Sequence, residues 1–306
     1  MISPAVVTPL ATERRRLATV WTCCLLAFAV AGCGSGDQAA SKSGGATEPV
    51  FEDMARATGL VFNHDSGATG RFYMPEIMGS GIALLDYDGD DDLDVFVLQG
   101  KTLEPGAANA QDNADGKPRH RLFRNELNPS GSLAFTDVSE SAGIDDRGYG
   151  MGLAVGDIDN DGDPDLYLAN FGPNALYINN GDGTFSLAPE SGTNDDRFGS
   201  SAAFLDYDAD GLLDLFVVNY NTAGVSNNQA CRGFKGELSY CDPLGYPPAV
   251  DRIFRNLGGG KFEDSATETG VFEHFGTGLG VIGADFNADG ALDIYVANDK
   301  MANIYW

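Results

Sequence analysis

The chain has 306 residues, and its 45 Asp and Glu against 19 Lys and Arg give a formal net charge of −26 at pH 7. This acidic balance argues against nucleic acid as a partner and against electrostatic docking on anionic lipid, because both need a basic face. The three histidines, His64, His120 and His274, lie far apart, and the sequence contains no HExxH, P-loop or GxSxG motif. The common hydrolase and nucleotide-binding chemistries therefore find no support.

Residues 1–33 are predicted to be a signal peptide with a lipobox. Three arginines precede an apolar run from Leu17 to Val30, which suits a signal-peptide core and is short for a bilayer span. The run ends at Val30-Ala31-Gly32-Cys33, where Cys33 would be lipidated and become the first mature residue. An ordinary signal peptide with an incidental cysteine is the alternative. Residues 34–49, rich in Gly, Ser and Ala, predict a flexible tether.

This N-terminus predicts export and lipid anchoring in the cell envelope, at the outer membrane, in the periplasm or at the cell surface. The rest of the chain, residues 50–306, contains no other long apolar segment. We therefore expect contact with a membrane through the lipid anchor only.

One pattern occurs four times in residues 50–306. It has an apolar lead-in, the loop D-x-[DN]-x-D-[GD]-x-x-D, and then an alternating apolar strand. The four copies cover residues 81–99, 152–170, 201–219 and 280–298. Their central aromatic residues are expected in the core rather than on a sugar-binding platform; these are Phe96, Tyr167, Phe216 and Tyr295.

A second unit follows the loops. It has a strand that ends in Asn, a Gly-rich turn, and a strand that begins with Phe, as in a β-hairpin. Its copies cover residues 122–144, 176–193 and 253–271, with partial matches at Val50–Asp53 and Ile304–Trp306. The two units together give about four short antiparallel strands per repeat, which predicts an all-β fold made of β-propeller blades.

The acidic loops are predicted to bind Ca²⁺. Positions 1, 3, 5 and 9, counted from the first Asp of each loop, supply oxygen ligands, and Gly at position 6 lets position 7 present its backbone carbonyl. Hard oxygen ligands in a flexible loop suit Ca²⁺ better than Zn²⁺ or copper. The predicted ligands are Asp86, Asp88, Asp90, Asp92 and Asp94; Asp157, Asp159, Asp161, Asp163 and Asp165; Asp206, Asp208, Asp210, Leu212 and Asp214; and Asp285, Asn287, Asp289, Ala291 and Asp293.

Electrostatics favours a bound cation over solvated acidic turns, which are the alternative. Two carboxylates about 4 Å apart repel by roughly 4 kcal/mol at an effective dielectric constant near 20. The loop is not an EF-hand, because position 12 is apolar in every copy rather than Glu. Two departures matter: Asp91 replaces Gly at position 6 of the first loop, so that its turn is expected to be strained or shifted, and Asn287 should weaken the fourth site.

The loops resemble FG-GAP (VCBS-type) repeats, the calcium-bearing blades of integrin-α-like propellers. Tyr149-Gly150, Phe198-Gly199 and Phe275-Gly276 precede three of the loops. Pro75–Gly79, together with the stretch from Cys231 to Asn256, resembles bacterial members of the cartilage acidic protein family, which carry a C-terminal ASPIC/UnbV domain. The resemblance implies that the chain, which stops at Trp306 inside a new unit, supplies part of a seven-bladed ring; a closed four-bladed ring is the alternative.

Cys231 and Cys241 are predicted to form a disulfide, since the chain carries export signals. The bond would staple an insert at about residues 220–250 and add about 2–3 kcal/mol in the chain-entropy model. Two free thiols in a redox or metal site are the alternative, which lacks CxxC spacing and a nearby His. Loops on a rigid scaffold usually carry binding, so this insert is a candidate recognition surface.

The combined prediction is an exported calcium-binding propeller that acts as a binding module at the bacterial cell envelope, with structural calcium, no catalysis, and a protein or polysaccharide as ligand. The alternative is a propeller-based polysaccharide lyase or hydrolase. Acid–base candidates for it show no suggestive spacing; they are His64, His120, Arg71, Arg147 and Tyr149. A third interpretation is an interaction scaffold without a specific small ligand.

Overall fold

The computed structural model describes residues 51–104 and 120–306. The predicted signal peptide, the lipidation at Cys33 and the tether at 34–49 lie outside the described residues. Glu52–Trp306 form one compact unit. Within the described ranges, none of the helices has the length and apolar character needed to cross a bilayer.

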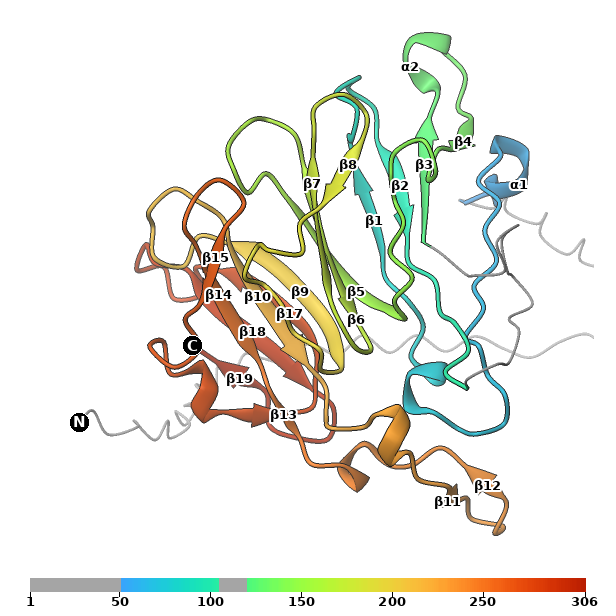
Figure 1. Ribbon diagram of the computed structural model, residues 1–306, viewed down its shortest axis with the longest axis vertical. Helices are drawn as coiled ribbons and strands as arrows, with labels where there is room; N and C mark the ends of the chain where they lie inside the picture. The colour runs from blue at the N-terminus through green and yellow to red at the C-terminus, as the bar shows by residue number, and fades with distance from the viewer. Residues whose placement is uncertain (1–50, 105–119) are drawn as a thin grey trace, which may run out of the picture. The chain divides into compact units, whose positions relative to one another are not determined.

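Four antiparallel sheets make up most of this unit and follow one another along the chain (Figure 1). Their strands, in sheet order, are β1 (Ile82–Leu85), β2 (Asp94–Val97), β3 (Arg121–Asn125) and β4 (Phe135–Asp137); β5 (Gly150–Gly156), β6 (Asp165–Asn170), β7 (Ala175–Asn179) and β8 (Phe185–Leu187); β9 (Gly199–Leu205), β10 (Asp214–Asn219), β14 (Arg252–Asn256) and β15 (Phe262–Asp264); and β17 (Gly278–Ala284), β18 (Asp293–Asn298) and β19 (Ile304–Tyr305).

Smaller elements connect the sheets. Two further pairs are β11 (Cys231–Arg232) with β12 (Leu238–Ser239), and β13 (Ala249–Val250) with β16 (Phe275–Gly276). The helical turns are α1 (Ala55–Thr58), α2 (Leu127–Ser130), η1 (Met74–Ile77), η2 (Val225–Asn227), η3 (Pro243–Gly245) and η4 (Val271–Glu273).

Each sheet is a propeller blade, and neighbouring blades meet through their first strands. Strand β1 contacts β5, β5 contacts β9, and β9 contacts β17. The all-β propeller prediction is therefore confirmed. The described blades do not close into a ring, because Ile82 and Leu84 on β1 are 63% and 60% exposed, and Ile282 on β17 is 55% exposed. The closed four-bladed alternative is wrong, and the seven-bladed ring stays a prediction.

The hydrophobic core lies between consecutive blades. Leu166 and Leu168 of β6 pack toward the first blade, whereas Tyr167 on the same strand packs toward the third. Both faces of the second strand are thus buried, and this explains its nearly continuous apolar sequence. The prediction that the central aromatic residues are core is confirmed for Phe96, Tyr167 and Phe216, which have no exposed surface.

Three glycines, two of which follow the fourth strands β4 and β8 and one of which follows α1, pack on the fourth strand of another blade. These glycines adopt left-handed φ values, and an added Cβ would come within 3 Å of a backbone carbonyl oxygen, so only glycine fits without strain. The pairs are Gly59 with Phe135, Gly143 with Phe185, and Gly192 with Phe262. The segment after Phe51 therefore follows the predicted repeat, although residues 51–53 form no strand.

In the second and third blades, the asparagine that ends the third strand links the blade to the preceding one. The amide of Asn179 donates to the carbonyl of Tyr87 at 2.9 Å, and that of Asn256 donates to Ile158 at 2.7 Å. Asn179 also donates to Pro164 in its own blade. One side chain thus satisfies carbonyl groups from two blades.

We expect Asn179→Ala to lower the free energy of unfolding by about 1–3 kcal/mol, because two carbonyl oxygens lose their donor. Urea denaturation measures this loss. The neighbouring Asn180 is exposed and bonds only within its own hairpin turn, so Asn180→Ala should change the free energy by about 0.5 kcal/mol or less. Equal effects of the two substitutions would contradict the linking role.

Candidate functional site

The four acidic loops join the first and second strands of the blades, so they lie at the same end of each sheet. In three loops, carboxylate oxygens from three residues lie within 4.8 Å of one another. The triads are Asp86, Asp88 and Asp90; Asp157, Asp159 and Asp165; and Asp206, Asp208 and Asp210. The fourth loop forms no such triad among the described residues, because Asn287 replaces the acid at position 3.

The first carboxylate organises each loop by accepting backbone N–H groups. Asp157 accepts from Asp161 and Gly162, at positions 5 and 6. The other loops repeat both bonds. Such local bonds from Asp to the backbone favour a tight turn over helix or sheet.

Positions 4 and 6 of every loop have positive φ. At position 6, Asp91 has φ +70°, where the other loops have glycine. Asp enters this region more readily than most residues, but a side chain there still costs energy. The prediction of a strained turn in the first loop is therefore confirmed, and the prediction of a shifted one is wrong, because Asp86 still accepts the N–H of Asp91.

The aspartate at position 9 does more than the predicted closing of a metal shell. One oxygen of Asp165 accepts the N–H of Ile158 at 3.0 Å, and the other accepts the N–H of Asn179 at 2.8 Å. Asp94 and Asp214 make the same two bonds in their blades. Each carboxylate thus joins its loop to the second and third strands.

Burial opposes the charge on these position-9 aspartates. It raises the pKa of Asp94 and Asp165 to about 7 and that of Asp214 to about 6, although backbone N–H groups bond to all three. Burial and neighbouring carboxylates also raise the pKa of Asp88 and Asp159. A cation placed among these oxygens would favour their charged forms.

The donor set fits a hard divalent cation. Buried oxygens of Asp92 and Asp159 have no hydrogen-bond partner among the described residues. Carboxylate oxygens without donors, within reach of other carboxylates, are the ligands that Ca²⁺ takes. The carboxylate of Asp163 lies close to Gly181 of the next hairpin turn, where an added Cβ would meet it.

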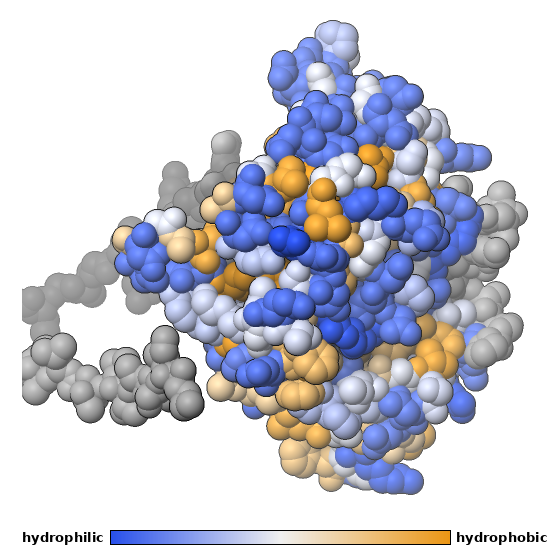
Figure 2. Space-filling view, turned by 60° about the vertical axis from the view of Figure 1, so that its left-hand side comes forward, coloured by the Kyte–Doolittle hydropathy of each residue, from blue (hydrophilic) through white to orange (hydrophobic). Residues whose placement is uncertain are grey.

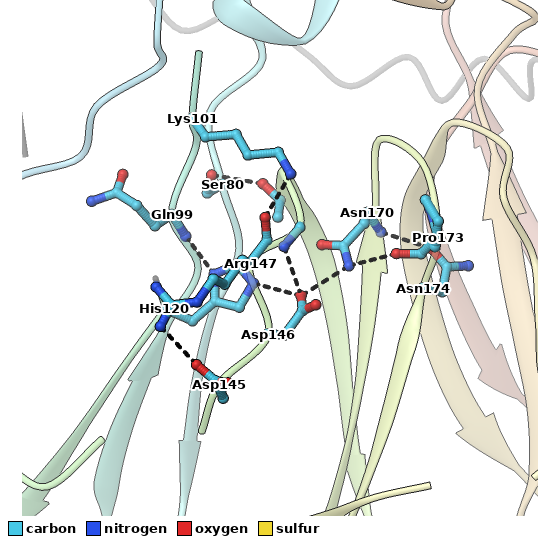
Figure 3. Close-up of polar contacts among 12 residues, drawn as sticks. Ser80, Gln99, Lys101, His120, Asp145, Asp146, Arg147, Asn170, Pro173 and Asn174 are labelled. Atoms are coloured by element: carbon cyan, nitrogen blue, oxygen red, sulfur yellow. Dashed lines mark hydrogen bonds and ion pairs between the residues drawn. The ribbon is translucent and has the colours of Figure 1, made fainter. Parts of the chain in front are cut away.

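Two of the acid–base candidates, His120 and Arg147, lie at the other end of the first two blades among polar groups that bond to one another (Figure 3). His120 is fully buried; its Nδ1 accepts the N–H of Gln99, and its Nε2 donates to Asp146. Asp146 is partly exposed; its burial opposes the charge, but hydrogen bonds from His120 and Asn170 hold its pKa below the usual value. This His–Asp pair therefore joins the first blade to the second.

The remaining candidates are also held by local contacts. His64 Nε2 lies 2.8 Å from Ser80 Oγ, whose hydrogen is directed to the carbonyl of Gly150. Tyr149 is 1% exposed and donates to the Ser66 carbonyl. Arg71 lies 3.7 Å from Glu104, and Arg147 pairs with Asp145. The structure brings His64 and His120 into no common site.

Sequence reasoning missed a set of acceptors just before the third strands. In each blade this side chain accepts the N–H at the end of the second strand, at 2.7 to 2.9 Å. The acceptors are His120, Asn174, Asp251 and Asn303. A polar residue before every third strand was the signal that could have revealed them.

The insert of the third blade contains the predicted disulfide. Cys231 and Cys241 form a disulfide, which fits an exported protein. Tyr240 donates to Glu76 at 3.0 Å and contacts the edge of the Phe72 ring. The insert therefore packs against the 72–76 segment, so that two segments far apart in sequence form one surface. Figure 1 shows β11 and β12 at the lower end.

Comparisons with known proteins agree with this geometry. A family model described as an FG-GAP-like repeat matches residues 157–217, which include the second and third loops. Cartilage acidic protein 1 from Mus musculus is 26% identical over 231 residues, and the protein from Homo sapiens is 27% identical over 227 residues. Each alignment covers 71% of this chain but 30% of the relative. The aligned region thus spans less than a third of these relatives.

A solved structure of the Photorhabdus luminescens Tc holotoxin pore matches 75% of this chain and 11% of that chain, at 18% identity and a TM-score of 0.21. A similarity at this level carries no argument about fold or function.

We expect the calcium-free chain to lose stability as pH rises from 5 to 8, because burial raises the pKa of Asp251 from 3.8 to about 7. The folded state then binds more protons than the unfolded state between these values, and the free energy of unfolding falls through that window. Asn174 and Asn303 fill the equivalent place in other blades, so Asp251→Asn should fold.

The variant Asp251→Asn should raise the free energy of unfolding at pH 8 by about 1–3 kcal/mol and flatten its pH dependence. Chemical denaturation across this pH range measures both effects. Asp182→Asn, at an exposed hairpin turn, is the control and should leave the slope unchanged. A steeper slope for Asp251→Asn would contradict this assignment.

Proposed function

The chain carries an FG-GAP-like repeat and is similar to cartilage acidic protein 1, and on this premise we propose that it is an exported, calcium-ordered propeller that binds another macromolecule at the cell envelope. The observation that supports calcium most directly is the convergence of carboxylates in three loops, with buried oxygens of Asp92 and Asp159 left without donors. Neutralising this repulsion would order the loops.

Calcium has a structural role in this proposal. An ion bound in a loop would draw together the residues around position 1 and the buried aspartate at position 9, which already bonds to the third strand. Extracellular modules commonly bind Ca²⁺ with dissociation constants of about 10⁻⁴–10⁻³ M. Export would supply such concentrations, and the disulfide is consistent with export.

Binding of a partner is assigned to the end of the blades opposite the loops. The insert lies there and is fixed by its disulfide and by the hydrogen bond from the Tyr240 hydroxyl to Glu76. Ion binding and partner binding would then use separate surfaces of one rigid scaffold. The partner is a protein or a polysaccharide. The occupation of His64 and His120 in structural hydrogen bonds supports a role without catalysis.

Millimolar Ca²⁺ should raise the melting temperature of the purified chain by several degrees and increase its resistance to proteolysis, since ligands that bind only the folded state stabilise it. Differential scanning calorimetry with and without a chelator measures the effect, and elemental analysis counts the bound ions. The proposal fails if calcium leaves both stability and metal content unchanged.

The fourth loop offers a gain-of-function test. Asn287→Asp should lower stability in chelator, because it adds a fourth carboxylate, and raise it in saturating Ca²⁺ by strengthening the weakest site. The sign of the effect should therefore reverse on calcium addition. Gln229→Glu adds the same charge in the insert and should show no reversal. The same sign in both buffers would argue against a metal in this loop.

A further inference from the structure

A pocket of about 690 Å³ opens at the end of the blades opposite the acidic loops. It exists because of the insert. The second and third strands are joined by short turns in the second and fourth blades, whereas in the third blade the chain leaves at Tyr220 and returns at Asp251. Residues 221–227 and 248–250, the two roots of the insert, form one side of the pocket. Its size is typical of a site for a small molecule or part of a polymer.

Aromatic side chains line the pocket in fixed positions. Phe171 and Phe198 pair through a backbone bridge, and their ring centres lie 4.7 Å apart with the planes nearly perpendicular. Phe275 is held by the pairing of its backbone with Val250, yet its side chain is 58% exposed. An exposed phenylalanine at the wall of a pocket offers apolar surface to a ligand.

Arg197 is a polar group of this pocket that is held by an ion pair. Its guanidinium donates to the buried carboxylate of Asp195 at 2.7 Å, and Asp195 accepts a second bond from Asn219. No hydrogen bond occupies the other guanidinium nitrogens among the residues that the structure describes. Because Asp195 holds the guanidinium in place, those N–H groups are oriented before any ligand binds.

The charges of the pocket balance. Arg197 is paired with Asp195, and the exposed carboxylate of Asp196 also lines the pocket. Lys101 and Arg197 bring two positive charges to the pocket, and Asp195 and Asp196 bring two negative ones, so the pocket has no excess charge of either sign to select an ionic ligand. The hydroxyls of Thr222 and Ser226 can both donate and accept. An uncharged ligand with many hydroxyls and an apolar face satisfies these groups best.

We propose that this pocket binds a neutral saccharide, with a sugar face against Phe171 or Phe275 and hydroxyls on Arg197 and Asp196. The inference rests on the proposed binding function and names its ligand class. Figure 2 shows a mostly hydrophilic face on which apolar residues occur in several places, some of them toward the lower end, where Figure 1 places the insert.

The experiment is an array of neutral and anionic oligosaccharides probed with the calcium-loaded chain, followed by calorimetric titration of the neutral oligosaccharides that bind. Phe275→Ala and Arg197→Gln should each weaken binding of a neutral sugar by about tenfold or more, which is about 1.4 kcal/mol. Two matched controls lie outside the pocket: Phe234→Ala, at the fully exposed tip of the insert, and Arg255→Gln, on β14. Both should change affinity by about twofold or less.

The melting temperature of every variant with and without calcium is measured on the same samples. Arg197→Lys is added in case Arg197→Gln does not fold, because it keeps the charge and loses the planar fork. The inference is overturned if the folded chain binds no neutral oligosaccharide, binds only anionic ones, or binds equally well after both pocket substitutions. A calcium-dependent rise in melting temperature without sugar binding would leave the calcium proposal standing and reject only the saccharide.

Discussion

The fold depends on a buried carboxylate that accepts two backbone N–H groups. In the first three blades the aspartate at the start of the second strand bonds to the acidic loop before it and to the asparagine at the end of the third strand. Burial makes the charge of this group costly, as the raised pKa of Asp94 and Asp165 shows. The same group lies beside the carboxylates proposed to hold calcium, so a cation would stabilise the bond pattern that defines the blade.

Short strands explain why side chains hold both ends of every blade. The third strand contains five residues at most and pairs with the second strand over only a few positions. Backbone groups beyond the paired region need other partners. Asp165 and Asn179 satisfy them at the loop end, and Asn174 satisfies one at the other end. Side chains therefore fix the third strand of this blade at both ends.

Sequence alone predicted the parts of the molecule that repeat. The four loops, the hairpins and the blade architecture follow from a pattern that occurs several times, and the disulfide followed from two cysteines in a chain predicted to be exported. Contacts between distant segments could not be predicted, because no local pattern encodes them. Two examples are the hydrogen bond from the Asn179 amide to the Tyr87 carbonyl and the hydrogen bond from the Tyr240 hydroxyl to Glu76. The turn at Asp91 could be predicted only in part, since the sequence showed the missing glycine but not that the backbone would keep its conformation.

The distribution of charge separates the two ends of the blades. Acidic residues at the loop end lie close together in three of the loops. At the insert end, three ion pairs bring opposite charges together: Arg197 with Asp195, Lys300 with Asp242, and Arg71 with Glu104. The net negative charge of the chain repels anionic polymers. At physiological salt this repulsion is weak beyond contact distance, because the Debye length is about 8 Å. A locally balanced surface can therefore select its ligand by hydrogen bonding and shape, which favours an uncharged partner over an ionic one.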